Sequence, residues 1–168
     1  MLTLIGAGGA TAHDLVDMTR RGARLYWSAA PSKIYAEPKR LERLGYVTSR
    51  REAGRTRERR RYALTEAGRT ALREWIGSPS GFPRIYHEAA CRVLAADLAD
   101  DATVLESVRG LREELDELSG LLEEAERVTT SLPHRARNLR LVHSLGRRLV
   151  EAHAEWLDEV ERELAQER

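Results

Sequence analysis

Arginine and lysine side chains crowd one stretch of the chain, residues 39–61. This stretch holds ten basic residues against three acidic ones. Guanidinium and ammonium groups bind phosphate oxygens through charge-assisted hydrogen bonds and displace counterions from a polyanion. Such binding needs no catalytic group, only cations held along one surface. The pattern therefore predicts a phosphate-rich partner for this part of the chain, the alternative being a charged surface that only meets solvent.

The other chemically reactive side chains form no recognisable site. His87 and Cys91 lie four residues apart and would supply at most two ligands of a metal site. Cys91 is the single cysteine, and no His-Glu-x-x-His, Gly-x-Ser-x-Gly or phosphate-loop motif occurs. The glycine-rich residues 4–12 lack the third glycine and the second βαβ unit of a dinucleotide site. We therefore expect no enzyme activity, no metal and no cofactor.

The element that must position the first basic residues is a helix over residues 31–44. Ile34, Pro38, Leu41 and Leu44 recur at spacings of four, three and three, which predicts one apolar helix face. Gly45 is expected to end the helix in the left-handed conformation. Pro38 lacks an amide N–H, so we expect a bend near the middle. The residues expected on the outer face and its flanks, toward bases and phosphates, are Ser32, Lys33, Tyr35, Lys39, Arg40 and Arg43.

A basic hairpin is expected to follow this helix. Two short extended runs, Tyr46–Arg51 and Arg59–Leu64, are joined by residues 52–57. Thr65 is a natural N-cap for another helix through about Ile76. A basic helix, a basic hairpin and a further helix are typical of a winged helix-turn-helix, with the first helix in the major groove of DNA. The arginines expected along the sides and tip of the wing are Arg50, Arg51, Arg59, Arg60, Arg55 and Arg57.

The same residues resemble a known family. The stretches Ser32-Lys33-Ile34-Tyr35, Lys39-Arg40-Leu41-Glu42, Leu44-Gly45-Tyr46-Val47 and Arg61-Tyr62-Ala63-Leu64-Thr65-Glu66-Ala67-Gly68 are similar to those of PadR-type transcriptional regulators. The last of them also occurs widely among MarR-like winged helices. The resemblance implies a dimeric, usually repressing DNA-binding protein that a small molecule often releases from DNA.

The residues before the basic helix fit the same domain. Leu2–Ile5 is expected to form a short helix, and Thr11 with Asp14 has the spacing of a capping box that opens a helix through about Arg21. Residues 26–31 are the expected turn into the recognition helix. The side chains expected to be buried by these helices and by the one after Thr65 are Leu15, Val16, Met18, Trp27, Ala67, Ala71, Leu72, Trp75 and Ile76.

The composition changes after a linker at residues 77–83. Residues 1–80 carry 16 Lys and Arg against 8 Asp and Glu, whereas residues 81–168 carry 12 against 19. A helix is expected over residues 84–99, burying Ile85, Ala89, Val93, Leu94 and Leu98. Only the first half of the chain therefore has the charge expected for binding a polyanion.

Two long helices are predicted to complete the chain. Thr103 and Glu106 have capping-box spacing, and apolar residues from Val104 to Ala125 then recur in a heptad pattern until Pro133 breaks the helix. A last helix over about residues 134–165 offers Leu139, Val142, Leu145, Leu149, Trp156, Val160 and Leu164. We expect an antiparallel pair whose remaining apolar surface meets a second subunit. The residues expected to form the dimer are Val108, Leu111, Leu115, Leu118, Leu122, Leu149, Trp156 and Val160.

These patterns predict a mainly α protein: a winged helix-turn-helix with a two-stranded β wing (residues 1–77), a linker (78–83) and a three-helix, coiled-coil-like dimerisation domain (84–168). We expect a homodimeric repressor that binds an inverted repeat in double-stranded DNA. An effector pocket, if one exists, is expected at the domain junction near Trp75, Tyr86 and Trp156. The alternative is a winged-helix module that binds another protein and has no operator of its own.

The expected location is the cytoplasm. A single cysteine excludes an internal disulfide framework and suits a reducing compartment. No apolar run approaches the roughly 18–20 residues that span a membrane. The apolar start of the chain has no basic residue before it, the first being Arg20, so export is not expected.

Overall fold

The computed structural model of the chain describes residues 1–21, 26, 31–53 and 58–166. It divides into two compact units, Met1–Phe82 (the N-terminal unit) and Pro83–Arg168 (the C-terminal unit). Helices dominate both units, so the mainly α class predicted from the sequence is confirmed. Within the described ranges, no helix is long and apolar enough to cross a membrane.

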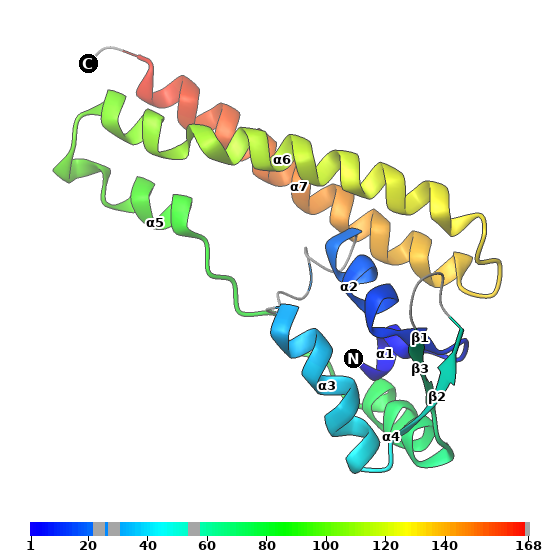
Figure 1. Cartoon of the computed structure of the whole chain (residues 1–168). Helices are drawn as coiled ribbons and strands as arrows, with labels where there is room; N and C mark the ends of the chain where they lie inside the picture. Colours follow the sequence, from blue (N-terminus) through cyan, green and yellow to red (C-terminus); the bar gives the residue numbers. More distant parts are fainter. Residues whose placement is uncertain (22–25, 27–30, 54–57, 167–168) are drawn as a thin grey trace. The chain divides into compact units, whose positions relative to one another are not determined.

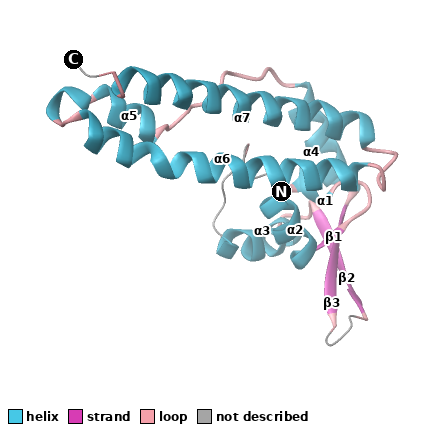
Figure 2. Cartoon of the chain, turned by 90° about the horizontal axis from the view of Figure 1, so that it is seen from above, coloured by secondary structure: helices cyan, strands magenta, loops and turns pink. Residues whose placement is uncertain are grey.

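The N-terminal unit combines short helices with one antiparallel sheet. Its elements are α1 (Leu2–Ile5), β1 (Ala10–Thr11), α2 (Ala12–Arg21), α3 (Pro31–Arg43), β2 (Val47–Glu52), β3 (Arg59–Leu64) and α4 (Glu66–Gly77). Figure 2 shows β2 and β3 as a hairpin that extends away from α1, α2 and α3. The predicted wing is therefore confirmed. The sheet order is β1-β3-β2, and the third strand, β1, was not predicted because two residues are too short to show strand periodicity.

One apolar cluster joins the helices of this unit to its sheet. Its buried members are Ile5, Ala10, Leu15, Ile34, Leu41, Val47, Tyr62 and Leu64. Ile34 and Leu41 come from α3, and the ring of Pro38, also on α3, is among the most deeply buried side chains of the chain. Burying each aliphatic side chain contributes about 1.5–3 kcal/mol. This burial fixes the rotation of α3 about its own axis and so decides which of its residues face outward.

The predicted helix ends of this unit are confirmed. The amide of Thr11 donates to Asp14 Oδ2 (2.8 Å), and the amide of Asp14 donates to Thr11 Oγ1 (3.2 Å), which is the capping box of α2. Thr65 Oγ1 accepts a hydrogen bond from the amide of Gly68 (3.1 Å) and caps α4. Gly45 has φ +76°, the left-handed conformation expected just past α3.

Two predicted core positions near the helix ends are wrong. Leu44, the first residue after α3, is 53% exposed. Met18 is also exposed, and Thr19 occupies the buried position instead. The hydroxyl of Thr19 donates to the carbonyl of Leu15 (2.8 Å), which satisfies its polar group inside the core.

The apolar stripe of α4 is only partly buried. Leu72 packs against the core, but Trp75 and Ile76 are 64% and 68% exposed. They lie in the last turn of the helix, one turn beyond Leu72, so the prediction that Trp75 is a core residue is wrong. Trp27 lies outside the described residues.

The C-terminal unit is built on two long helices. Its elements are α5 (Glu88–Leu94), a short 3₁₀ helix (Ala96–Leu98), α6 (Asp101–Thr129) and α7 (Ala136–Leu164). Figures 1 and 2 show α6 and α7 side by side over most of their length, as an antiparallel pair. The residues buried on the two helices are Val104, Val108, Leu115, Leu122 and Thr129 from α6, and His143, Gly146, Val150, Leu157 and Val160 from α7.

The heptad pattern predicted for α6 is confirmed, whereas the apolar face predicted for α7 is only partly buried: Val160 is buried, and Leu139, Leu149, Trp156 and Leu164 are half-buried. Leu111, Leu118 and Ala125 complete the α6 seam as half-buried residues. On α7, Val142 and Leu145 are 45% and 52% exposed. The helix carries more apolar residues than one stripe can hold, so periodicity did not select the buried set.

The beginning of the C-terminal unit also departs from the prediction. The helix expected over residues 84–99 is shortened to Glu88–Leu94. Ile85, Leu94 and Leu98, which were expected to be buried, are 65%, 85% and 85% exposed. Asp100 rather than Thr103 caps α6, because Asp100 Oδ1 accepts a hydrogen bond from the amide of Thr103 (2.8 Å).

A histidine pair attaches the start of α5 to α7. His87 Nδ1 accepts a hydrogen bond from the amide of Ala90 (3.1 Å) and so caps α5. The ring of His87 stacks on His153, with centroids 4.9 Å apart and planes 6° apart, and meets the edge of Trp156 at 5.2 Å. Burial, followed by the proximity of His153, lowers the pKa of His87 below its usual value.

This lowered pKa predicts that the chain loses stability in mild acid. An unfolded His87 binds a proton as the pH falls through about 6.5, while the folded one resists it, so the stabilisation is complete above that pH and is lost below it. We expect the unfolding temperature to drop between about pH 7.5 and pH 5.5. The variant His87→Asn keeps a capping side chain without a titrating ring, and its drop should be smaller. The matched control is His134→Asn at an exposed position. Equal pH profiles for the wild type and His87→Asn would contradict the prediction.

Candidate nucleic-acid interface

The outer face of α3 carries the polar residues that the sequence predicted there. Ser32, Lys33, Tyr35, Lys39, Arg40 and Arg43 are all exposed. The helix is continuous from Pro31 to Arg43, so Pro38 does not interrupt it. The side opposite the core therefore presents a row of hydrogen-bond donors on an element that its apolar face holds in place.

The wing places further arginines beside this helix face. Arg50, Arg51, Arg59 and Arg60 are exposed on β2 and β3. The antiparallel register sets Arg51 opposite Arg60 and Arg50 opposite Arg61. Like charges directly opposite each other destabilise a sheet unless acidic neighbours compensate them. The remaining predicted wing arginines, Arg55 and Arg57, lie outside the described residues.

Glutamates compensate these charges, one for each of four exposed arginines. The ion pairs are Arg40 with Glu37 (2.7 Å), Arg50 with Glu52 (2.8 Å), Arg51 with Glu58 (3.2 Å) and Arg60 with Glu42 (3.3 Å). Hydrogen bonds from Arg40 lower the pKa of Glu37. Exposed pairs of this kind contribute about 0–1 kcal/mol each to stability, and each neutralises one guanidinium charge.

A second group of cations has no such partner. Among the described residues, none forms an ion pair with Lys33, Lys39, Arg43 or Arg59. Three of these four side chains project from α3 and one from β3. They could meet phosphates or base edges without first breaking an internal contact. The structure thus separates the predicted DNA-contacting residues into paired and unpaired cations, a distinction the sequence did not reveal.

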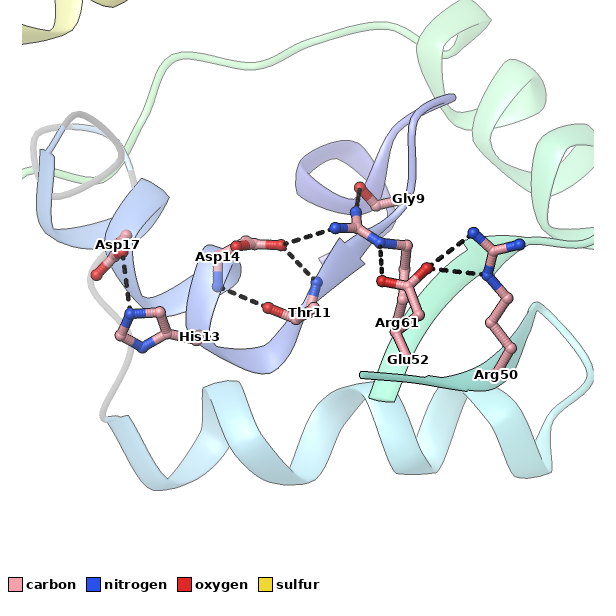
Figure 3. A network of polar contacts seen from close by, with 8 residues as sticks. All are labelled: Gly9, Thr11, His13, Asp14, Asp17, Arg50, Glu52 and Arg61. Atoms are coloured by element: carbon pink, nitrogen blue, oxygen red, sulfur yellow. Dashed lines mark hydrogen bonds and ion pairs between the residues drawn. The ribbon is translucent and has the colours of Figure 1, made fainter. Parts of the chain in front are cut away.

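Arg61 has a structural position that was not predicted for it. Figure 3 shows its guanidinium between α2, the loop before β1 and strand β2. It donates to the carbonyl of Gly9 (3.1 Å) and to Glu52 Oε2 (2.9 Å) and lies 3.8 Å from Asp14. Hydrogen bonds from Arg61 and then Arg50 lower the pKa of Glu52. Arg61 therefore joins the wing to α2. In the sequence it stands among other arginines, and only the strand register would have shown that its role is structural.

No second kind of site emerges in the described part of the chain. None of its His, Cys, Asp and Glu side chains gather in threes that could hold a metal ion. Cys91 is exposed, and His87 is engaged in the cap of α5. Of the residues proposed for an effector pocket, Trp75 is exposed on α4, Tyr86 is 87% exposed, and Trp156 lies against His87. The effector pocket stays a prediction.

The N-terminal unit resembles known proteins in sequence. Residues 2–74 match the family model described as "Transcriptional regulator PadR-like family". The N-terminal unit is therefore similar in sequence to this family. The curated "Negative transcriptional regulator PadR" of Bacillus subtilis is 31% identical over 77 residues, which are 45% of this chain and 42% of that protein. The matched region thus spans less than half of the length of that relative.

Solved structures extend the likeness in fold to both units. Bacillus subtilis PadR in complex with operator DNA has a TM-score of 0.75 at 21% identity, covering 95% of this chain and 92% of that one. The same protein in complex with p-coumaric acid has a TM-score of 0.67 at 19% identity, covering 98% and 96%. The virulence activator AphA of Vibrio cholerae has a TM-score of 0.72 at 25% identity, covering 97% and 94%. At 19–25% identity, these comparisons show a shared fold.

The division into paired and unpaired cations predicts different roles for two arginines of α3. Arg43 has no carboxylate partner, so Arg43→Ala should reduce discrimination between a selected site and random duplex by about 1–3 kcal/mol if it contacts a base. Arg40 is bound by Glu37, so Arg40→Ala serves as the matched control and should change discrimination less. Titrating each variant with both duplexes measures the difference. Equal losses on the two duplexes for Arg43→Ala would remove it from the base-contacting residues.

Proposed function

We propose that this chain is a sequence-specific DNA-binding repressor that acts in the cytoplasm as a homodimer on an inverted-repeat operator. The observation that carries the proposal is the set of unpaired cations on α3, beside the exposed arginines of the wing. A helix of this type binds in the major groove, while the wing follows the backbone. Contacts to phosphates would position the protein, and contacts to base edges would select the sequence.

Exposed apolar residues of the C-terminal unit support the homodimer. Val108, Leu115, Leu122 and Val160, which were predicted to form the dimer, are already buried within the single chain. Leu111, Leu118, Leu149 and Trp156 are half-buried. Other large apolar side chains are more exposed and form a better candidate surface for a second copy: Ile85, Leu94, Leu98, Leu141, Val142 and Leu145. Exposed apolar groups of this size favour a protein–protein contact.

A two-fold dimer would explain the kind of operator. It would place two α3 helices about one DNA turn, roughly 34 Å, or a multiple of it apart, and so require an inverted repeat. Repression is supported by the name of the Bacillus subtilis relative, a negative regulator. The p-coumaric acid complex of that protein supports a small-molecule effector for this chain.

The decisive experiment is selection of bound DNA fragments by the purified protein, followed by sequencing. A recovered inverted repeat would support the proposal, whereas failure to bind any DNA would favour a module that binds another protein. Salt dependence gives an independent check. Three phosphate contacts from each of two chains, for example by Lys33, Lys39 and Arg59, predict that log K falls with log salt at a slope of about −5. A flat response would contradict DNA binding.

The dimer proposal predicts that exposed and buried leucines respond differently to a charge. Two double variants, Leu94→Glu with Leu98→Glu and Leu141→Glu with Leu145→Glu, place carboxylates on exposed positions. At least one should yield a folded monomer with weakened operator binding. Leu115→Glu, at a position only 5% exposed, should instead unfold the C-terminal unit because it buries an unpaired charge. Light scattering measures the assembly and circular dichroism the fold. A wild-type monomer in solution would overturn the dimer.

A further inference from the structure

Glu42 connects the recognition helix to both long strands of the wing. It lies in the last turn of α3, where Glu42 Oε1 accepts a hydrogen bond from the hydroxyl of Ser49 on β2 (2.5 Å). Glu42 Oε2 accepts a hydrogen bond from Nη1 of Arg60 on β3 (3.3 Å). The Glu42 side chain is 33% exposed and the Arg60 side chain 51% exposed, so both remain within reach of solvent and of a ligand.

A carboxylate at this position works against binding a polyanion. It lies between two elements that are proposed to contact DNA, and it adds a negative charge where phosphates would approach. It also cancels the charge of Arg60, whereas Arg59, the preceding residue on the same strand, has no ion-pair partner among the described residues. The fold of the unit does not require the charge, because Ser49 needs only an acceptor oxygen. The charge therefore has its main effect on what Arg60 can bind.

We propose that Glu42 is a specificity-determining residue that withholds Arg60 from DNA phosphates. The inference rests on the proposed function as a DNA-binding regulator. Nearly all of the free energy of binding to random DNA comes from neutralising phosphates, whereas binding to an operator adds contacts to base edges. An arginine that a carboxylate already neutralises adds little to the free energy of binding to random DNA. Glu42 thus lowers affinity for random DNA more than affinity for the operator and widens the ratio between them.

The substitution Glu42→Gln tests this directly. Glutamine keeps an acceptor oxygen for Ser49 but loses the charge that holds Arg60. On random duplex, the slope of log K against log salt should become steeper by about 0.9 for each freed arginine. Affinity for random duplex at low salt should rise about two- to fivefold for each freed arginine, the range expected for an exposed ion pair. Affinity for the selected operator should rise less, so the specificity ratio should fall.

Two further variants separate this effect from a change in net charge. Glu66→Gln removes the same charge from α4, where Glu66 pairs with Arg69 and Arg73, and should leave the salt slope unchanged. The double variant Glu42→Gln with Arg60→Gln removes both members of the pair and should restore the wild-type slope. Thermal unfolding of each variant confirms that it is folded.

The comparison with Arg59 keeps the test decisive even if Glu42→Gln alone does not fold. Arg59→Gln removes an unpaired cation and should make the slope shallower by about 0.9 per chain. The double variant Glu42→Gln with Arg60→Gln should not make the slope shallower. An equal loss for both would mean that Arg60 contacts phosphate in the wild type, and it would overturn the inference while leaving DNA binding intact. A steeper slope for Glu66→Gln equal to that of Glu42→Gln would also overturn it. A wild-type protein that binds no DNA would instead refute the proposed function.

Discussion

The arrangement of the recognition helix and the wing depends on one tight backbone junction. Gly45 turns the chain out of α3 with φ +76°, and the carbonyl of Tyr46 then accepts a hydrogen bond from the amide of Thr65 (3.1 Å). A Cβ on Gly68 would lie 2.0 Å from that same carbonyl oxygen, so only glycine lets α4 approach so closely. The hydroxyl of Thr65 donates to the carbonyl of Gly45 (2.6 Å) and caps α4 as well. These contacts tie the end of α3 and the start of the wing to the first turn of α4.

Electrostatic balance is the second constraint on this surface. An exposed helix and hairpin that carry only cations would repel each other, and the strand register would set arginine against arginine. Glutamates at positions 37, 42, 52 and 58 remove most of that repulsion at little net energetic gain, because exposed ion pairs are weak. The surface that we propose to contact DNA is therefore basic, with part of its charge neutralised by its own glutamates.

The sequence predicts the parts of this fold that local chemistry determines. Glycine at a positive φ, a Thr–Asp capping box and a heptad seam each have one dominant structural reading, and Gly45, Thr11 and α6 follow it. It fails where tertiary context chooses among several local options. Helix α7 has more apolar residues than one face can bury, so packing against α6 selected Leu157 over Leu145. The candidate site was predictable as a set of exposed basic residues. Their division into paired and unpaired cations was not, because a pair such as Glu42–Arg60 joins residues 18 positions apart.

The proposed DNA binding requires two chains to act together. Two features are consistent with this requirement: the N-terminal unit has few unpaired cations, and the C-terminal unit has exposed apolar residues. Three unpaired phosphate contacts from a single chain would give a salt slope of only about −2.7, which corresponds to weak binding at physiological salt. Adding cations to the helix would raise affinity for all DNA alike and erase discrimination. Joining two chains doubles the number of contacts and also doubles the bases that must match, so affinity and specificity increase together. The apolar residues left exposed on the C-terminal unit, such as Leu94 and Leu145, are those that we propose for such a pairing.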